Sequence, residues 1–250
     1  MNNELTYRTA APTPALAAVV ESYWLLRNPG PARPVWLLPD GRIDVLFSRA
    51  RVEPCHVTLM GLGTEAEAAP LAADAHIIGV SLRLLAPEYL LRTPVADLLN
   101  GVRPLPADFW GFAPADLDDF DACCARLDAL LPTLLAPALD PRKRRLSELL
   151  YAADGGLPVR ELAAQVGWGS RQINRYFQHY LGLPLKAYSG ILRFRAAFPQ
   201  LKAGRLFPEQ QFADQAHFIR EVRRLAGVRP KDLARNENDR FIQFSAWPVP

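Results

Sequence analysis

The feature that most constrains the fold of this 250-residue chain is an internal repeat in its C-terminal half. Five residues recur 45 positions later with equal spacing, an offset that relates Ile173, Arg175, Phe177, Gly182 and Leu183 to Phe218, Arg220, Val222, Gly227 and Val228. A fixed offset between similar segments indicates that one supersecondary unit occurs twice. We therefore expect the C-terminal half to contain two related helical units.

The first copy has the pattern of a helix-turn-helix. Apolar residues at helical spacing predict one helix before Gly167, and this glycine suits a C-terminal helix stop. Ser170 is the predicted N-cap of a second helix, whose apolar stripe includes Ile173 and Phe177. Two short helices joined by a Gly-containing turn form this motif.

The polar face of the second helix in each copy carries long side chains that can bond base edges or phosphates. These side chains are Arg171, Gln172, Asn174, Arg175 and Gln178 in the first copy, and Gln215, His217, Arg220, Arg223 and Arg224 in the second. The alternative is an ordinary solvated helix, in which Asp and Glu are usually mixed with the basic residues. Neither set of five contains an acid, so the pattern favours DNA binding.

The segment between the copies predicts a spacer helix of about 15 residues, which would be about 22 Å long. A spacer of that length would hold two recognition helices near one turn of DNA apart, roughly 34 Å. Pro199 is expected to break or kink the end of the spacer.

The formal charge of the chain is divided between its halves. Up to Asp140 there are 10 Arg against 17 Asp plus Glu, a net charge of −7, whereas 19 Lys plus Arg face 9 acids from Pro141 onward, a net charge of +10. This asymmetry favours an acidic module joined to one that binds a polyanion. Prolines and four consecutive basic residues mark the boundary, so we predict a β-rich sensor or dimerisation domain with a C-terminal helix at 1–135, a linker at 136–145 and a DNA-binding domain at 146–250.

The N-terminal half has strand patterns. "PVWLLPDGRIDVLFS" predicts a hairpin around a Pro-Asp-Gly turn, and "HVTLMGLG" and "HIIGVSLRLL" predict further strands. The expected fold class is α+β, with an N-terminal β-rich, cupin-like domain and an all-α C-terminal domain whose two helix-turn-helix motifs are joined by a helix. His56 and His76 are far apart in sequence without an HxH pattern, so we expect no metal site.

A heptad seam follows the predicted strands. Apolar residues alternate at steps of three and four, at Leu117, Phe120, Cys124, Leu127, Leu131 and Leu134. The seam either pairs with the same seam of a second copy in a homodimer or packs against the sheet of its own domain. The sequence leaves both alternatives open.

Two segments resemble the helix-turn-helix motifs of the AraC/XylS transcription regulators. "ELAAQVGWGSRQINRYFQHYLGLPLKAY" resembles their first motif, and "FADQAHFIREVRRLAGVRPKDL" resembles the "GFxDQSHFxRxFRRxxGxxP" signature of their second. "PDGRIDVLF" and "GVSLRLLAPEYLL" also resemble sensor-like N-terminal domains in one branch of that family. The resemblance implies DNA binding through both motifs, with base-reading positions at Arg171, Asn174 and Arg175 and at Gln215, His217 and Arg220.

The second motif departs from the family pattern. "GRLFPEQQFADQ" leaves about three residues fewer than usual, with Pro208 among them, for the helix that braces the second recognition helix. We therefore expect a shortened brace.

These observations predict a cytoplasmic, sequence-specific DNA-binding transcription regulator that responds to a small-molecule effector. The predicted DNA-binding residues are Ser170, Arg171, Gln172, Asn174, Arg175, Gln178, Lys186, Gln215, His217, Arg220 and Arg223. Double-stranded DNA is the main expected partner, and RNA polymerase and a second copy of the chain are further candidates. We expect no cofactor, no catalytic residues and no membrane contact, because no apolar run reaches the roughly 18 residues of a membrane span and no phosphate-binding or nucleophile motif is present.

Two other classes compete with the regulator. One is a cupin-like small-molecule-binding or metal-dependent enzyme with an accessory basic domain. The other is a nucleic-acid-associated structural protein without sequence preference.

Overall fold

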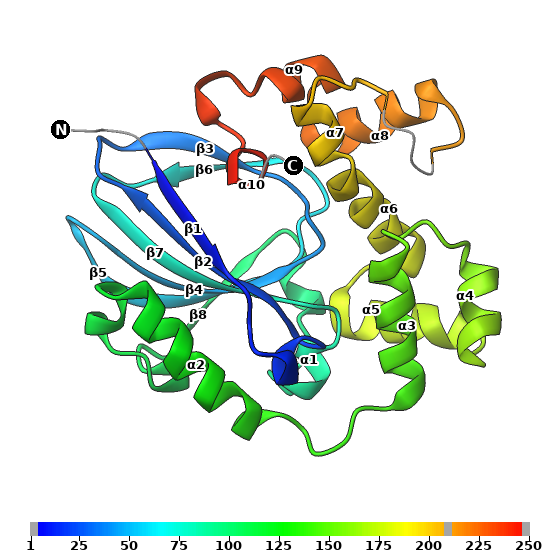
Figure 1. Cartoon of the computed structure of the whole chain (residues 1–250), viewed down its shortest axis with the longest axis horizontal. Coiled ribbons are helices and arrows are strands. Elements are labelled where there is room, and N and C mark those ends of the chain that lie inside the picture. The colour runs from blue at the N-terminus through cyan, green and yellow to red at the C-terminus, as the bar shows by residue number, and fades with distance from the viewer. Residues whose placement is uncertain (1–4, 208–211, 247–250) are drawn as a thin grey trace. The chain divides into compact units, whose positions relative to one another are not determined.

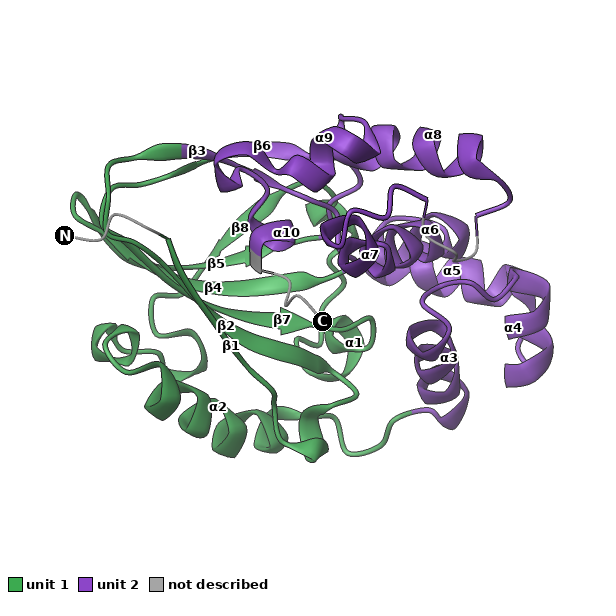
Figure 2. Cartoon of the chain, turned by 45° about the horizontal axis from the view of Figure 1, so that its top comes forward, with its two compact units in different colours: residues 1–33, 42–61, 70–139 green, residues 34–41, 62–69, 140–250 purple. Residues whose placement is uncertain are grey.

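The computed structural model describes residues 5–207 and 212–246, and the chain divides into two compact units (Figures 1 and 2). Unit 1 comprises Met1–Arg33, Arg42–Gly61 and Pro70–Leu139, and unit 2 comprises Pro34–Gly41, Leu62–Ala69 and Asp140–Pro250. Strands dominate the N-terminal half and helices the C-terminal half, so the predicted α+β fold class is confirmed. The predicted boundaries at 135 and 146 stay a prediction.

Unit 1 is built on a six-stranded antiparallel sheet with the strand order β1-β2-β7-β4-β5-β8. Its strands are β1 Thr6–Ala10, β2 Val20–Asn28, β4 Ile43–Ala50, β5 Glu53–Met60, β7 Ala75–Leu82 and β8 Val102–Leu105. The strands predicted from "HVTLMGLG" and "HIIGVSLRLL" are confirmed as β5 and β7.

The predicted hairpin around the Pro-Asp-Gly turn is wrong. Strand β3 (Arg33–Leu37) pairs with β6 (Glu67–Leu71) in a separate two-stranded sheet, whereas β4 pairs with β5 and β7. Strand β4 lies in the interior of the larger sheet, where both of its edges are occupied, and Val45 and Phe47 are fully buried there. The turn at Gly41, with φ of 78°, therefore directs the chain from one sheet into the other.

Helix α2 (Phe120–Leu134) lies along one face of the larger sheet (Figure 2). Five seam residues are buried within unit 1, namely Leu117, Phe120, Cys124, Leu127 and Leu131, whereas Leu134 is half-exposed. Asp128 on α2 accepts hydrogen bonds from the Tyr23 hydroxyl at 2.8 Å and from the Thr13 amide at 3.1 Å. In the structure, then, the seam closes over its own sheet. A short helix, α1 (Ala86–Tyr89), follows β7.

The helices of unit 2 are α3 Pro141–Ala152, α4 Val159–Val166, α5 Ser170–Leu181, α6 Leu185–Ala196, α7 Phe198–Lys202, α8 Gln215–Ala226, α9 Pro230–Arg235 and α10 Ile242–Ala246. The spacer helix α6 has 12 residues and not the expected 15, which corresponds to about 18 Å. The expected break at Pro199 is confirmed, because this residue lies in the first turn of α7. Among residues 5–207 and 212–246, no helix is both long and apolar enough to cross a bilayer.

Unit 2 also contains segments from the N-terminal half. The Trp36 amide donates to the Arg240 carbonyl at 2.6 Å, and the Leu38 amide donates to the Gln243 side chain at 2.9 Å. The C-terminal segment contributes the buried side chains Phe241, Ile242 and Phe244.

Candidate nucleic-acid interface

Helices α4 and α5 form the predicted first helix-turn-helix. Gly167 ends α4 at φ of 62° and Gly182 ends α5 at φ of 78°, both in the left-handed conformation that favours glycine. The predicted N-cap at Ser170 is wrong, because Gly169 is the N-cap and Ser170 is the first residue of α5. The Gln172 side-chain oxygen accepts from the Gly169 amide at 3.1 Å, so the glutamine supplies the capping bond.

One face of α5 is packed into the core of unit 2. Ile173, Phe177 and Leu181 are almost fully buried. The Phe177 ring also meets the buried Tyr188 ring of α6 edge-on at 5.4 Å between centroids. This packing fixes which side chains of α5 can face outward.

The opposite face of α5 is exposed and carries no acid. Its exposed residues include Arg171, Gln172, Arg175 and Gln178, as predicted. Within the part of the chain that the structure describes, neither Arg171 nor Arg175 has an ion-pair or hydrogen-bond partner. Two unpaired guanidinium groups, one helical turn apart, are thus available to phosphates or to guanine base edges.

Asn174 differs from the other predicted readers, because both ends of its amide are bonded inside unit 2. Its Nδ2 donates to the Ser170 carbonyl at 3.0 Å, and its Oδ1 accepts from the Leu185 amide at 3.1 Å. The side chain is only half-exposed. The structure therefore gives Asn174 an internal role between α5 and the start of α6.

Helix α8, the predicted second recognition helix, also ends at a left-handed glycine, Gly227 with φ of 69°. Its N-cap is Asp214, whose carboxylate accepts from the His217 amide at 2.7 Å, while Nδ1 of His217 accepts from the Ala213 amide at 3.2 Å. His217 thus presents Nε2–H as its remaining donor. The predicted shortened brace contains Pro208 and falls largely on residues 208–211, outside the described residues.

The polar face of α8 exposes the predicted residues Gln215, Arg220 and Arg223. Glu221 is the one acid on this helix, and Arg224 forms an ion pair with it at 2.8 Å. This guanidinium lowers the pKa of the Glu221 carboxyl. The carboxylate is accordingly neutralised within the helix.

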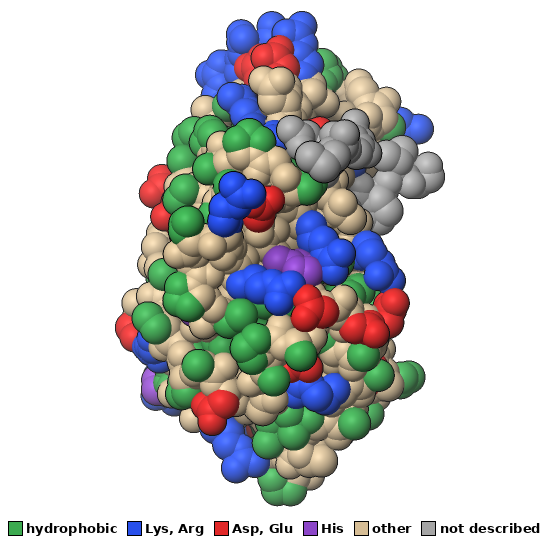
Figure 3. All heavy atoms as spheres, turned by 90° about the vertical axis from the view of Figure 1, so that its left-hand side faces the viewer, with side chains coloured by type: hydrophobic (Ala, Val, Ile, Leu, Met, Phe, Trp, Pro, Cys, Tyr) green, Lys and Arg blue, Asp and Glu red, His purple; other side chains and the backbone are tan. Residues whose placement is uncertain are grey.

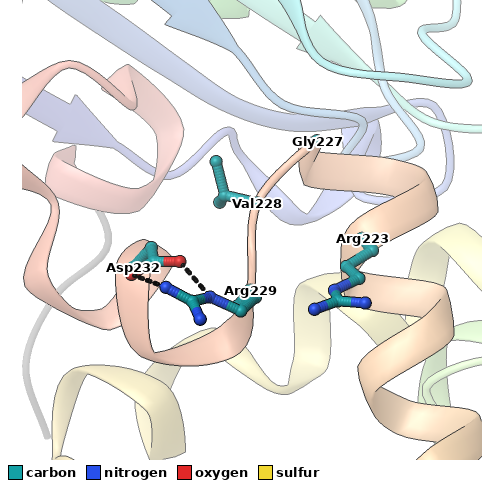
Figure 4. A pocket seen from close by; sticks show the side chains of 5 residues that line it. All are labelled: Arg223, Gly227, Val228, Arg229 and Asp232. Carbon is teal, nitrogen blue, oxygen red and sulfur yellow. Dashed lines mark hydrogen bonds and ion pairs between the residues drawn. The ribbon is translucent and has the colours of Figure 1, made fainter.

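An open cavity of about 460 Å³ lies where α8 passes into α9 (Figure 4). Arg223, Gly227, Val228, Arg229 and Asp232 line it, and Arg229 forms an ion pair with Asp232 at 2.8 Å. Arg223 lies across the cavity from this pair (Figure 4). It is the cationic lining residue without an ion-pair partner among the described residues.

Two lysines occupy equivalent positions after α5 and α8. Lys186 is the second residue of α6, and Lys231, 45 residues later, is the second residue of α9. Both side chains are exposed. Lys186 was predicted from the sequence and Lys231 was not, although the repeat offset of 45 residues points to it.

The basic run Arg142–Arg145 belongs to α3 and not to an extended linker. Arg142 stacks over the Trp168 ring at 5.8 Å, and the Lys143 ammonium group lies 4.9 Å from the centre of the Tyr176 ring. These contacts fix part of the basic run against the first helix-turn-helix.

The histidines of unit 1 are not brought together. His56 is exposed on β5, whereas His76 on β7 is a direct cross-strand neighbour of both Arg27 and Arg49. Charged side chains of both signs and a histidine lie close together on the face shown in Figure 3. Burial and the two arginines lower the pKa of His76 to about 4, so the imidazole is neutral near pH 7. Among residues 5–207 and 212–246, no group of three His, Cys, Asp or Glu side chains could hold a metal ion.

Comparison with known proteins gives one family model and several solved structures. Residues 8–104 match the family described as "Domain of unknown function (DUF6597)". No curated protein matches the sequence.

The similar structures are of ToxT from Vibrio cholerae. Apo ToxT K231A is 8% identical, with 93% of this chain and 97% of that chain covered and a TM-score of 0.47. ToxT bound to (E)-4-(8-methylnaphthalen-1-yl)but-3-enoic acid is 10% identical, with coverage of 92% and 97% and a TM-score of 0.43. Wild-type ToxT with an unsaturated fatty acid is 10% identical, with coverage of 94% and 97% and a TM-score of 0.41.

The chain has the order of regions that the resemblance of the two motifs implied. A β-rich region that contains the DUF6597 match precedes a helical region. The helical region holds a helix-turn-helix and a second recognition-type helix at an offset of 45 residues.

Proposed function

We propose that this protein is a transcription regulator whose unit 2 binds double-stranded DNA sequence-specifically. One observation carries the proposal: α5 and α8 begin 45 residues apart, end at equivalent left-handed glycines, and expose Arg175 and Arg220 at equivalent positions. Two helices that end in the same way and expose an arginine at the same position are suited to contact two sites on one DNA duplex.

The distribution of charge supports DNA as the ligand. The chain from Pro141 onward has a net charge of +10, from 19 Lys plus Arg and 9 acids, and α5 contributes no acid at all. A basic surface attracts a polyanion without sequence preference, because phosphate contacts carry no sequence information. The repeated placement of long polar side chains on two helices supports base readout in addition.

The exposed side chains divide by position into readers and anchors. We assign base-edge readout to Arg171, Arg175 and Gln178 on α5 and to Gln215, Arg220 and Arg223 on α8. Lys186 and Lys231, at the starts of the helices that follow, are assigned to phosphates. Ser170, Gln172 and His217 lie at the first turns, where Gln172 and His217 also serve as caps. The small-molecule effector, the homodimer, the contact with RNA polymerase and the cytoplasmic location stay predictions.

The experiment is selection of a preferred site by the purified full chain from random duplex DNA, followed by binding of single variants to single-base changes of that site. Arg175→Ala and Arg220→Ala should each weaken the preferred site by about 5- to 150-fold, equivalent to 1–3 kcal/mol, and relax selectivity at one or two base pairs. Arg51→Ala in unit 1 removes the same charge and serves as the matched control, for which we expect unchanged binding.

Salt dependence separates the alternatives further. If about 6 to 10 phosphates are neutralised, affinity should fall by several orders of magnitude between 50 mM and 200 mM salt. Recovery of no preferred sequence, or an equal loss on every sequence for both arginine variants, would show a nonspecific nucleic-acid-binding protein. Retention of DNA that does not depend on salt would contradict the proposal itself.

A further inference from the structure

The start of α6 has an unusual hydrogen-bond requirement. The first amides of a helix have no acceptor within the helix, so they need side chains, water or other groups as partners. The residue before α6 is Pro184, which offers no side-chain oxygen, and no side-chain capping bond comes from it. Leu185, the first residue of α6, is completely buried, so its amide lies in a part of the unit where an unmet donor is costly.

Asn174 supplies the missing acceptor from the preceding helix. Its Oδ1 accepts from the Leu185 amide at 3.1 Å while its Nδ2 holds the Ser170 carbonyl at 3.0 Å. One side chain is therefore bonded to the first turn of α5 and to the first residue of α6. These two bonds fix the recognition helix against the helix that follows it.

The second copy of the repeat provides an independent comparison. At an offset of 45 residues, Asn174 corresponds to Ile219 and Leu185 corresponds to Pro230, the first residue of α9. Proline has no backbone N–H and is well suited to the first position of a helix. The copy that lacks the donor also lacks the acceptor, which is the pairing expected if the asparagine is present to satisfy that donor.

We infer that Asn174 is a positioning residue that caps α6 and orients α5, and that it does not read bases. One consequence of this inference rests on the proposed DNA binding. It is that base readout by the first motif falls on Arg171, Arg175 and Gln178. The capping itself is a property of unit 2 without DNA.

The test without DNA compares Asn174→Ala, Asn174→Asp and Gln178→Ala in the full chain. Asn174→Ala should lower the folding equilibrium constant about tenfold and expose the Leu185 amide to hydrogen exchange, because the amide loses its acceptor. Asn174→Asp keeps an acceptor oxygen and should retain protection of Leu185. Gln178→Ala changes an exposed polar residue on the same helix and is the matched control, with both measurements unchanged.

A double-variant cycle keeps the test decisive if a single variant is poorly folded. Asn174→Ile removes the acceptor, Leu185→Pro removes the donor, and the double variant recreates the pair of the second copy. The double variant should be at least about fivefold more stable than the product of the single effects predicts. Additive effects, together with unchanged Leu185 exchange in Asn174→Ala, would overturn the inference.

Binding to the selected DNA site separates this inference from the proposed function. Asn174→Ala should weaken all single-base variants of the site by the same factor, whereas Arg175→Ala should change selectivity. Loss of selectivity at one base pair in Asn174→Ala would make Asn174 a reader and refute the positioning role. If no DNA sequence is preferred by the wild-type chain, the proposed function fails, and the exchange and stability results still decide the capping role.

Discussion

Tyr188 offers the sharpest test of how unit 2 is assembled. Its hydroxyl donates to the Gly41 carbonyl at 3.0 Å and lies 2.7 Å from the Tyr151 hydroxyl, and its side chain is completely buried. Gly41 belongs to Pro34–Gly41, a segment from the N-terminal half that is part of this unit. The hydroxyl thus links the spacer helix α6 to a segment about 150 residues earlier in the chain.

We expect Tyr188→Phe to loosen that segment without unfolding the chain. The change removes two hydrogen bonds and keeps the ring that packs against Phe177. Only the bond to Gly41 reaches the segment, so at about 1 kcal/mol for a buried hydrogen bond the local opening equilibrium should rise by a factor of about 5. The amides of Trp36 and Leu38, both hydrogen-bonded within unit 2, report on this opening.

The assay is hydrogen exchange of the peptide that contains residues 34–41, measured in the full chain. Tyr151→Phe is the matched control, because it removes one end of the same hydroxyl pair and leaves the bond to Gly41 in place. Faster exchange in Tyr188→Phe and near-normal exchange in Tyr151→Phe are the expected results. Equal exchange in Tyr188→Phe and wild type would refute the idea that this hydroxyl holds the segment.

Two further predictions concern unit 1. Because the folded-state pKa of His76 is lowered to about 4 from an ordinary value of 6.5, the unfolded chain binds this proton first, and the free energy of unfolding should fall as the pH is lowered from 6.5 to 4. Urea unfolding of His76→Gln should depend less steeply on pH in that window, and identical slopes would contradict this assignment. Changing both Leu127 and Leu131 to Lys should abolish cooperative unfolding of unit 1, because two charges would enter its core, whereas Lys at the exposed Ala125 and Ala129 should be tolerated. A soluble monomer with an unchanged melting curve would instead indicate a dimer seam.

The features that the sequence predicted correctly are those set by neighbours in the chain. The apolar stripe of α5, the glycine stop at Gly167 and the break at Pro199 each depend on a few adjacent residues. Helical spacing and backbone conformation are local properties, so they can be predicted from the sequence without knowledge of the fold. The heptad spacing of the seam is also a local signal, but it left open whether the seam faces its own sheet or a second copy of the chain.

The features that the sequence did not predict depend on contacts between distant segments. The apolar runs that flank Gly41 predict a hairpin, yet β5 and β7 occupy both edges of β4, and β3 pairs with β6 instead. Strand β2 was not predicted. Its segment "VESYWLLRN" has buried residues on both faces of the strand, so apolar and polar residues do not alternate regularly along it. Residues 34–41 and 62–69 belong to unit 2, and nothing in their own sequence predicts this.

The two motifs show why polar residues on a recognition helix cannot all be counted as readers. In the first motif, the start of the following helix is held by the hydrogen bond from Leu185 to Asn174. In the second, Pro230 removes that donor, and the exposed ion pair of Arg229 and Asp232 lies at the start of α9. An exposed pair is weak and screened by salt, whereas a bond to a buried amide is not. The bond between Asn174 and Leu185 should therefore be less sensitive to ionic strength than the ion pair of Arg229 and Asp232, a difference that follows from the residue types at the starts of α6 and α9.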